Sequence, residues 1–205
     1  MGTEVALGGW TVVFMMRVRH ATPFASGMAV TGFWLGITCG RIFLGFITPM
    51  IGEELSVTVW HPSPCPISSF FRFSFGPSLT STQLYALFVI IFGFVFWLVP
   101  SFYISAIAVS LQGFFLGPLF PVLIVVATKI LPQSLHVSSI GFASAIGGAG
   151  AALLPFAVGA LAESQGVQIL QPFIIGLSVG ILFLWLCLWR VSKAVARAIC
   201  FEASS

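Results

Sequence analysis

The sequence contains no Asp and no Asn, and its 205 residues include only five acids and eight Lys or Arg. Without Asp there are no Asp-based metal sites and no aspartyl chemistry, and without Asn there is no N-glycosylation sequon. Charged residues make up 6% of the chain, whereas about 25% is usual for a soluble domain. So few charges cannot coat a water-soluble globule, and we expect a lipid bilayer to surround most of this surface.

Signatures of several other functions are also missing. The formal net charge of +3 is small and scattered, so we expect no nucleic-acid partner. The cysteines show no CxxC spacing, and there is no HExxH motif and no P-loop. The three histidines lie in connections between apolar segments, at spacings that suggest no metal site. We therefore expect no enzymatic activity and no cofactor.

Long hydrophobic runs are abundant, with a mean hydropathy of +1.11. They are continuous rather than alternating, which predicts α-helices and not a barrel. Short connections predict antiparallel neighbours in a compact bundle, and the first and third runs are shorter than the about 20 residues that a spanning helix needs. The six segments are 5–16, 24–51, 84–99, 101–131, 137–161 and 170–189.

Glycines recur at four-residue spacing within these segments, as in Gly32, Gly36 and Gly40, and in Gly113 with Gly117. Small residues one turn apart allow helix backbones to approach closely in a membrane. Taken singly, each glycine is explained by packing. As a set, they indicate tightly packed helices that can slide or rock, as transporter helices do.

The stretch from Thr58 to Gln83 is rich in Pro and Ser, and Arg72 interrupts its apolar patch. Its removal would join the preceding residues to Leu84–Val99 and restore a helix of spanning length. One hypothesis is a translated, unspliced intron, because Val59 can encode a splice donor and Gln83 an acceptor. The alternative is a genuine re-entrant or surface loop. The chain as a whole, residues 1–205, is predicted to be one transmembrane domain.

Two residues near the start are candidates for substrate or proton handling. An ionisable residue in an apolar helix is costly and tends to face a cavity, so Glu4 could carry a proton there; it could also lie in a polar N-terminal tail. Trp10 could line the same cavity or belong to an interfacial aromatic belt.

Arg41 and Gln112 are further candidates. Arg41 is the only basic residue in the second segment; it could snorkel to the interface, or pair with a carboxylate or helix end that changes partner during gating, and we favour the second. Gln112 could bind substrate or hydrogen-bond another helix, and the interhelical role is favoured.

Cation placement predicts the orientation. Five basic residues fall at ends or loops of one parity and two, Arg17 and Arg19, at the other. The positive-inside rule then favours a cytoplasmic C-terminus. A plasma-membrane location and a vacuolar one are not distinguished.

The combination of Gly2–Trp10, Thr31–Gly36 and Gly40-Arg41 resembles helices seven and eight of major facilitator superfamily transporters, in particular the fungal-type group related to the "bypass of stop codon" transporters. Gln112–Pro121 resembles helix ten of that group, and residues 140–159 and 170–172 resemble its helices eleven and twelve. The resemblance covers nearly the whole chain except about 58–83.

The resemblance implies an all-α fold, the C-terminal six-helix bundle of a twelve-helix transporter with a truncated first helix. It also implies a small-molecule solute bound between two halves, and a missing N-terminal six-helix half as partner. Gating or structural roles fall to Arg41, Gly36, Gly40 and Gly45. Such a half would not transport alone. The alternative is a non-transporting membrane protein, a degenerate half with a binding or regulatory role.

Overall fold

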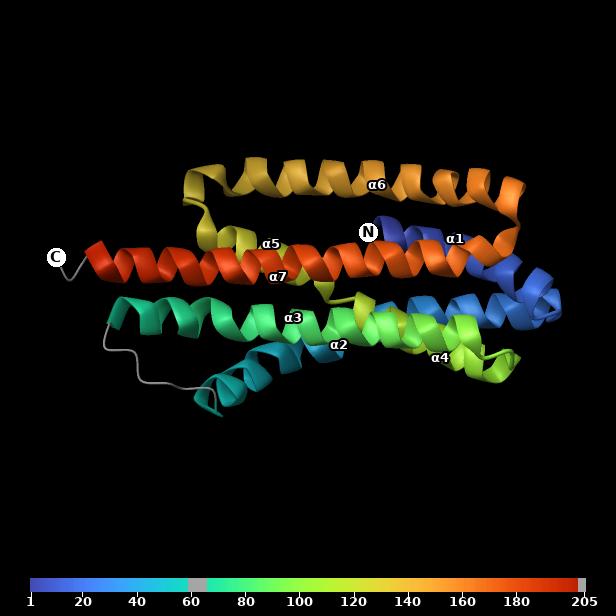
Figure 1. Cartoon of the computed structure of the whole chain (residues 1–205), viewed down its shortest axis with the longest axis horizontal. Coiled ribbons are helices and arrows are strands. Elements are labelled where there is room, and N and C mark those ends of the chain that lie inside the picture. Colours follow the sequence, from blue (N-terminus) through green and yellow to red (C-terminus); the bar gives the residue numbers. More distant parts are fainter. Residues whose placement is uncertain (59–65, 203–205) are drawn as a thin grey trace.

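The computed structural model describes the backbone of residues 1–58 and 66–202, and the side chains of residues 1–46, 81–128, 131–187 and 190. Within these ranges the secondary structure is entirely helical. The helices run roughly parallel or antiparallel to one long axis (Figure 1). They are α1 (Gly2–Val18), α2 (Pro23–Thr58), α3 (Pro66–Leu98), α4 (Phe102–Leu116), α5 (Leu119–Ile130), α6 (His136–Gln165) and α7 (Leu170–Glu202), with short 3₁₀ turns at Gln133–Leu135 and Val167–Ile169.

Five helical stretches are long and apolar enough to cross a bilayer, so the chain is a multi-pass integral membrane protein. Their mean hydropathies lie between 1.4 and 2.2. α1 is not among them, since its 17 residues reach only about 25 Å at 1.5 Å per residue. The five stretches are Pro23–Phe46, Ser81–Leu98, Phe102–Thr128, Gln133–Gln165 and Val167–Cys187.

The predicted all-helical, multi-span architecture is confirmed, but three helices are longer than expected. α7 continues to Glu202, beyond the predicted end at residue 189. α2 continues to Thr58, and α3 begins at Pro66, so residues 66–83 belong to the same helix as Leu84 onward. Residues 59–65 of the predicted insert lie outside the described part of the chain. The retained-intron hypothesis concerns the origin of this stretch and stays a prediction.

The segment predicted as one helix over 101–131 is broken into α4 and α5 at Gly117 and Pro118. Two prolines cause the break. Neither Pro118 nor Pro121 has a backbone N–H, so the carbonyls four residues earlier, of Phe114 and Gly117, lose their helical hydrogen-bond partners.

The closest interface lies between α2 and α4, where glycines face each other's backbones. A Cβ added to Gly36 or Gly40 would meet the carbonyl oxygen of Ser110 or Phe114. The contact is reciprocal: a Cβ on Gly113 would lie 2.5 Å from the carbonyl oxygen of Phe33. Only helices without side chains at these positions can approach so closely, as the small-residue spacing predicts for a membrane interface.

Aromatic side chains fill the remaining core. Phe115 of α4 stacks on Phe88 and Phe92 of α3, with ring centroids 4.7 and 5.8 Å apart. Phe14 of α1 packs against Phe96 of α3 at 4.9 Å, and both side chains are fully buried. These contacts hold α1, α3 and α4 together around one hydrophobic centre.

α6 lies at the edge of the bundle and packs mainly against α1 (Figure 1). Only 6% of its apolar span is buried, against 44% of the span in α3. Large apolar side chains such as Phe142 and Phe156 point away from the rest of the chain.

Candidate functional site

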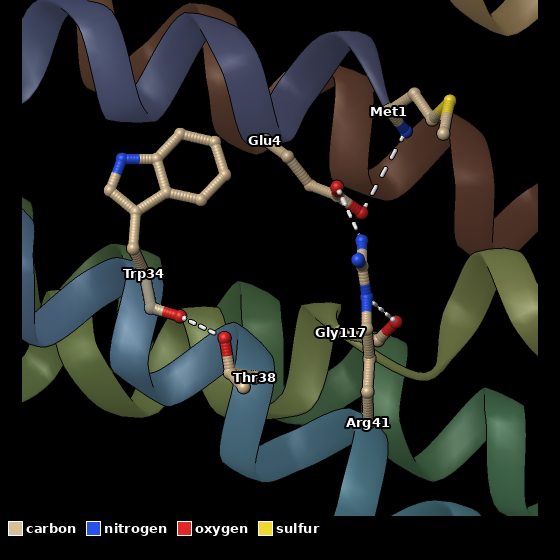
Figure 2. Close-up of polar contacts among 6 residues, drawn as sticks. All are labelled: Met1, Glu4, Trp34, Thr38, Arg41 and Gly117. Atoms are coloured by element: carbon tan, nitrogen blue, oxygen red, sulfur yellow. Dashed lines mark hydrogen bonds and ion pairs between the residues drawn. The ribbon is translucent and has the colours of Figure 1, made fainter.

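An ion pair between Glu4 of α1 and Arg41 of α2 is the centre of the candidate site. Arg41 Nη2 lies 3.2 Å from Glu4 Oε2. The same guanidinium donates a hydrogen bond from Nε to the carbonyl oxygen of Gly117, at 3.3 Å. Figure 2 shows Arg41 extending between the two acceptors, so one side chain joins α1, α2 and the end of α4.

The Gly117 carbonyl is available to Arg41 because of Pro121. In an unbroken helix this oxygen would accept a hydrogen bond from the N–H of residue 121, which proline lacks. Arg41 therefore occupies a helix end, and the negative end of a helix dipole favours a cation. The proline break and the arginine together form one structural unit.

Burial differs between the two partners of the ion pair. The Glu4 side chain is 7% exposed and that of Arg41 is 43% exposed. The amino group of Met1 lies 3.8 Å from Glu4 Oε1 (Figure 2). Glu4 is thus part of a helix and faces the bundle, which contradicts the alternative of a polar tail.

Trp10 has a different contact from either one predicted. Its indole Nε1 donates a hydrogen bond to the carbonyl oxygen of Pro155 in α6, at 3.0 Å. The ring also covers Gly159, where an added Cβ would lie 3.0 Å from Trp10 Cζ2. Trp10 therefore joins α1 to α6 at the proline of that helix.

The Gln112 side chain points toward α3 and not toward the Glu4–Arg41 pair. It is fully buried in α4 and its amide nitrogen lies over Gly93 of α3. Neither its oxygen nor its nitrogen has a hydrogen-bond partner among the described residues. The structure therefore places Gln112 inside the bundle.

The predicted gating glycines fall into two groups. Gly36 and Gly40 lie in the α2–α4 interface. Gly40 immediately precedes Arg41 in α2, and Gly36 lies about one turn earlier. Gly45 is exposed, and a Cβ added there would meet no atom of the described chain within 4 Å. Close packing therefore accounts for Gly36 and Gly40 but not for Gly45.

Sequence reasoning missed a second arginine. Arg19, just beyond α1, donates from Nη2 to the carbonyl oxygens of Phe96 and Trp97, at 2.7 and 3.0 Å, and from Nε to Ser105 Oγ at 3.2 Å. The loss of water around the group lowers the pKa of Arg19 from its ordinary value. The signal was a cation on the side of the membrane with fewer positive charges, which the positive-inside rule alone leaves unexplained.

Two further patterns concern hydrolase motifs and metal ligands. Residues 176–180 match the G-x-S-x-G spacing of hydrolase nucleophiles, but that motif needs a strand-to-helix turn. Here Ser178 lies within α7 and donates to the carbonyl oxygen of Ile174, at 2.8 Å. Among the described side chains, no three of the types His, Cys, Asp and Glu come close enough to hold a metal ion.

Comparison with known proteins gives one relative. The chain is 31% identical over 172 residues to "Bypass of stop codon protein 6" of Saccharomyces cerevisiae, an alignment that covers 82% of this chain. The chain spans 31% of the length of that relative. No protein-family profile matches the chain. No solved structure matches it either.

Proposed function

We propose that this chain is the C-terminal six-helix half of a major facilitator superfamily transporter, which moves a small solute across a membrane by alternating access. On this proposal the chain is not an enzyme, and its C-terminus is cytoplasmic. The yeast relative, the multi-span helices and the glycine and Gln112–Pro121 patterns support the family. The substrate would bind between this half and a second one.

The observation that carries the proposal is the Glu4–Arg41 pair. Ionisable residues inside a membrane protein are expensive and are kept for ion or substrate handling. Here the pair joins two helices to the break in a third, so a change in charge on Glu4 would alter how α1 is held against α2 and α4. A proton on Glu4 would remove the ion pair and leave Arg41 bonded to Gly117 alone. This provides two discrete arrangements, which a gate requires.

α6 supports the need for a second half. Its apolar span is almost unburied within this chain, and its glycines at 141 and 148 face open space, so α6 offers a surface on which another helix could pack closely in place of lipid. We propose that the missing half covers this helix. The chain alone would then form one wall of the substrate site and would not transport.

The test is complementation in yeast that lacks the relative. This chain is co-expressed with the part of the yeast protein that the alignment does not cover, and uptake of an isotope-labelled mixture of small solutes is followed. We expect at least one solute to accumulate only when both parts are present. Glu4→Gln should abolish most of that uptake, while the control Glu163→Gln, at an exposed acid of α6, should not.

A second candidate is a membrane protein that binds or regulates another protein without transport. Uptake that stays at background with both parts present, together with stable association of the chain with another membrane protein, would replace the transporter proposal. Uptake by the purified chain alone in liposomes would show that the chain is not a half.

A further inference from the structure

Three fully buried polar side chains lie inside the bundle without hydrogen-bond partners. They are Thr11 of α1, Gln112 of α4 and Gln171 of α7, each 0% exposed. The Thr11 hydroxyl and both amide atoms of each glutamine are unpaired within the described chain. A buried polar group without a partner costs about 1–3 kcal/mol. Native structures keep few such groups, so this set requires an explanation.

The three side chains lie at nearly one level of the bundle. Phe14 of α1 contacts Phe96 of α3, and Thr11 and Gly93 each precede these residues by three positions on helices that run in the same direction (Figure 1). Thr11 and Gly93 are therefore at similar depth.

Gly93 connects this level to the two glutamines. A Cβ on Gly93 would lie 3.1 Å from Gln112 Nε2 and 3.3 Å from Ile175 Cγ1. Gln171 precedes Ile175 by one turn of α7. The three polar side chains thus lie within about one helical turn, or about 5.4 Å, along the bundle axis.

The chemistry of the set identifies what would bind there. It offers hydroxyl and amide donors together with hydroxyl and carbonyl acceptors, and no charge. A neutral set with both donors and acceptors suits water, which makes about three hydrogen bonds when buried. Arg19 is bonded to the Phe96 carbonyl at the nearby end of the bundle.

We propose that Thr11, Gln112 and Gln171 form an internal water-binding site that joins α1, α4 and α7 above Gly93. The bound water replaces the direct interhelical hydrogen bonds that these side chains do not make. The site is separate from the Glu4–Arg41 pair and does not depend on transport.

A double-mutant cycle tests the coupling. Gln112→Met and Gln171→Met, which keep the side-chain volume, are made singly and together in the full chain purified in detergent. We expect each single change to lower the midpoint of thermal unfolding by about 2–4 °C, because it leaves the remaining members of the site unpaired. The double variant should lose less than the sum of the two. The exposed Gln165→Met serves as control and should leave the midpoint unchanged.

Thr11→Val, which replaces a hydroxyl by a methyl group of the same shape, gives a milder second probe. It should lower the midpoint in the wild-type background and have no effect in the double variant. If a single Gln→Met change raises the midpoint of unfolding, the glutamine amide binds no water in the native protein. Strictly additive losses would show independent residues. Either result would overturn the proposal.

A density map from crystals, or from cryo-electron microscopy with a bound antibody fragment, provides the direct test. We expect a water peak within hydrogen-bond distance of at least two of the three side chains. A direct amide–amide hydrogen bond between Gln112 and Gln171, with no water, would also overturn the proposal.

Discussion

The interface between α2 and α4 and the surface of α6 show opposite uses of glycine and of apolar side chains. Between α2 and α4, glycines on both helices let the backbones touch. α6 is also rich in small residues, yet Gly141 and Gly148 face open space. In its apolar span only 6% of residues are buried. The spacing of small residues therefore identifies a helix that can pack closely. Whether it does depends on the surface of the helix beside it.

The difference indicates where the chain is rigid and where it can move. The α2–α4 contact is backbone against backbone, which leaves no room for adjustment. α6 is held through α1, by the Trp10–Pro155 hydrogen bond and by a few contacts of small residues. A helix with few buried contacts belongs to the least stable part of a protein.

The largest expected effect comes from filling the tight interface. Gly40→Leu would push a side chain into the Phe114 backbone and should lower the free energy of unfolding by about 3 kcal/mol or more. The measurement is helicity by circular dichroism during titration with SDS in mixed micelles. Gly45→Leu lies on the same helix, at a position where an added Cβ meets no described residue within 4 Å. It is the matched control and should leave stability unchanged or slightly improved. Equal stability of the two variants would disprove the close contact.

The next effect comes from the ion pair that lies beside this interface. Arg41→Met leaves Glu4 buried without its partner and should cost about 2 kcal/mol, since Arg41 itself is half-exposed. Adding Glu4→Gln should recover part of the loss, because no charge then remains buried. Arg190→Met, at an exposed cation of α7, is the control in the same unfolding titration. A double variant that loses the full sum would show that the two side chains do not interact.

A smaller effect is expected where α6 joins the bundle. Trp10→Phe removes the hydrogen bond to Pro155 and should cost about 1 kcal/mol. Amide hydrogen exchange should then increase in α6 and not in α4. Trp34→Phe, which removes a similar aromatic area over Gly8, should not change exchange in α6. If both variants speed exchange in α6 equally, the hydrogen bond is not what holds this helix.

The smallest effect is expected on the open surface of α6. Phe156, 76% exposed, can be changed to Ala with a loss of less than about 0.5 kcal/mol in the chain alone. If a second half covers α6, the same substitution should weaken co-purification of the chain with that half several-fold. An unchanged yield of the complex would place the contact elsewhere.

Most of the architecture could be predicted from the sequence, because continuous apolar runs and short connections leave few alternatives in a membrane. The prolines signalled the break at Gly117 and Pro118. The residue that hydrogen-bonds the freed Gly117 carbonyl, Arg41, is 76 residues away in the chain, and the sequence did not indicate this contact. The close approach at Gly36 and Gly40 followed from their spacing, whereas Gly45, the same residue type on the same helix, approaches no other helix among the described residues. The local sequence shows which contacts a residue can make, and the fold determines which residue it contacts.

The residues of the candidate site could be predicted from the sequence, but their contacts could not. Glu4 and Arg41 stand out as rare charges in apolar segments, yet nothing in the sequence states that they meet. Thr11 and Gln171 are ordinary in composition, and their significance appears only when α1, α4 and α7 are brought together. The sequence showed Arg19 only as an exception to the charge pattern, because its three acceptors lie more than 70 residues further along the chain.

The contacts of Arg19 also have a consequence for biogenesis. Its hydrogen bonds reach the end of α3 and the start of α4, and neither exists when the ribosome has made only α1 and α2. Until α3 and α4 are made, we expect the Arg19 guanidinium to remain in water or among the lipid headgroups. Only when α4 leaves the translocon can the loop after α1 close onto its acceptors. Closure of this loop is thus a late step in the insertion of α1 to α4, and a ribosome-stalled chain that ends before Phe102 should leave Arg19 open to added protease.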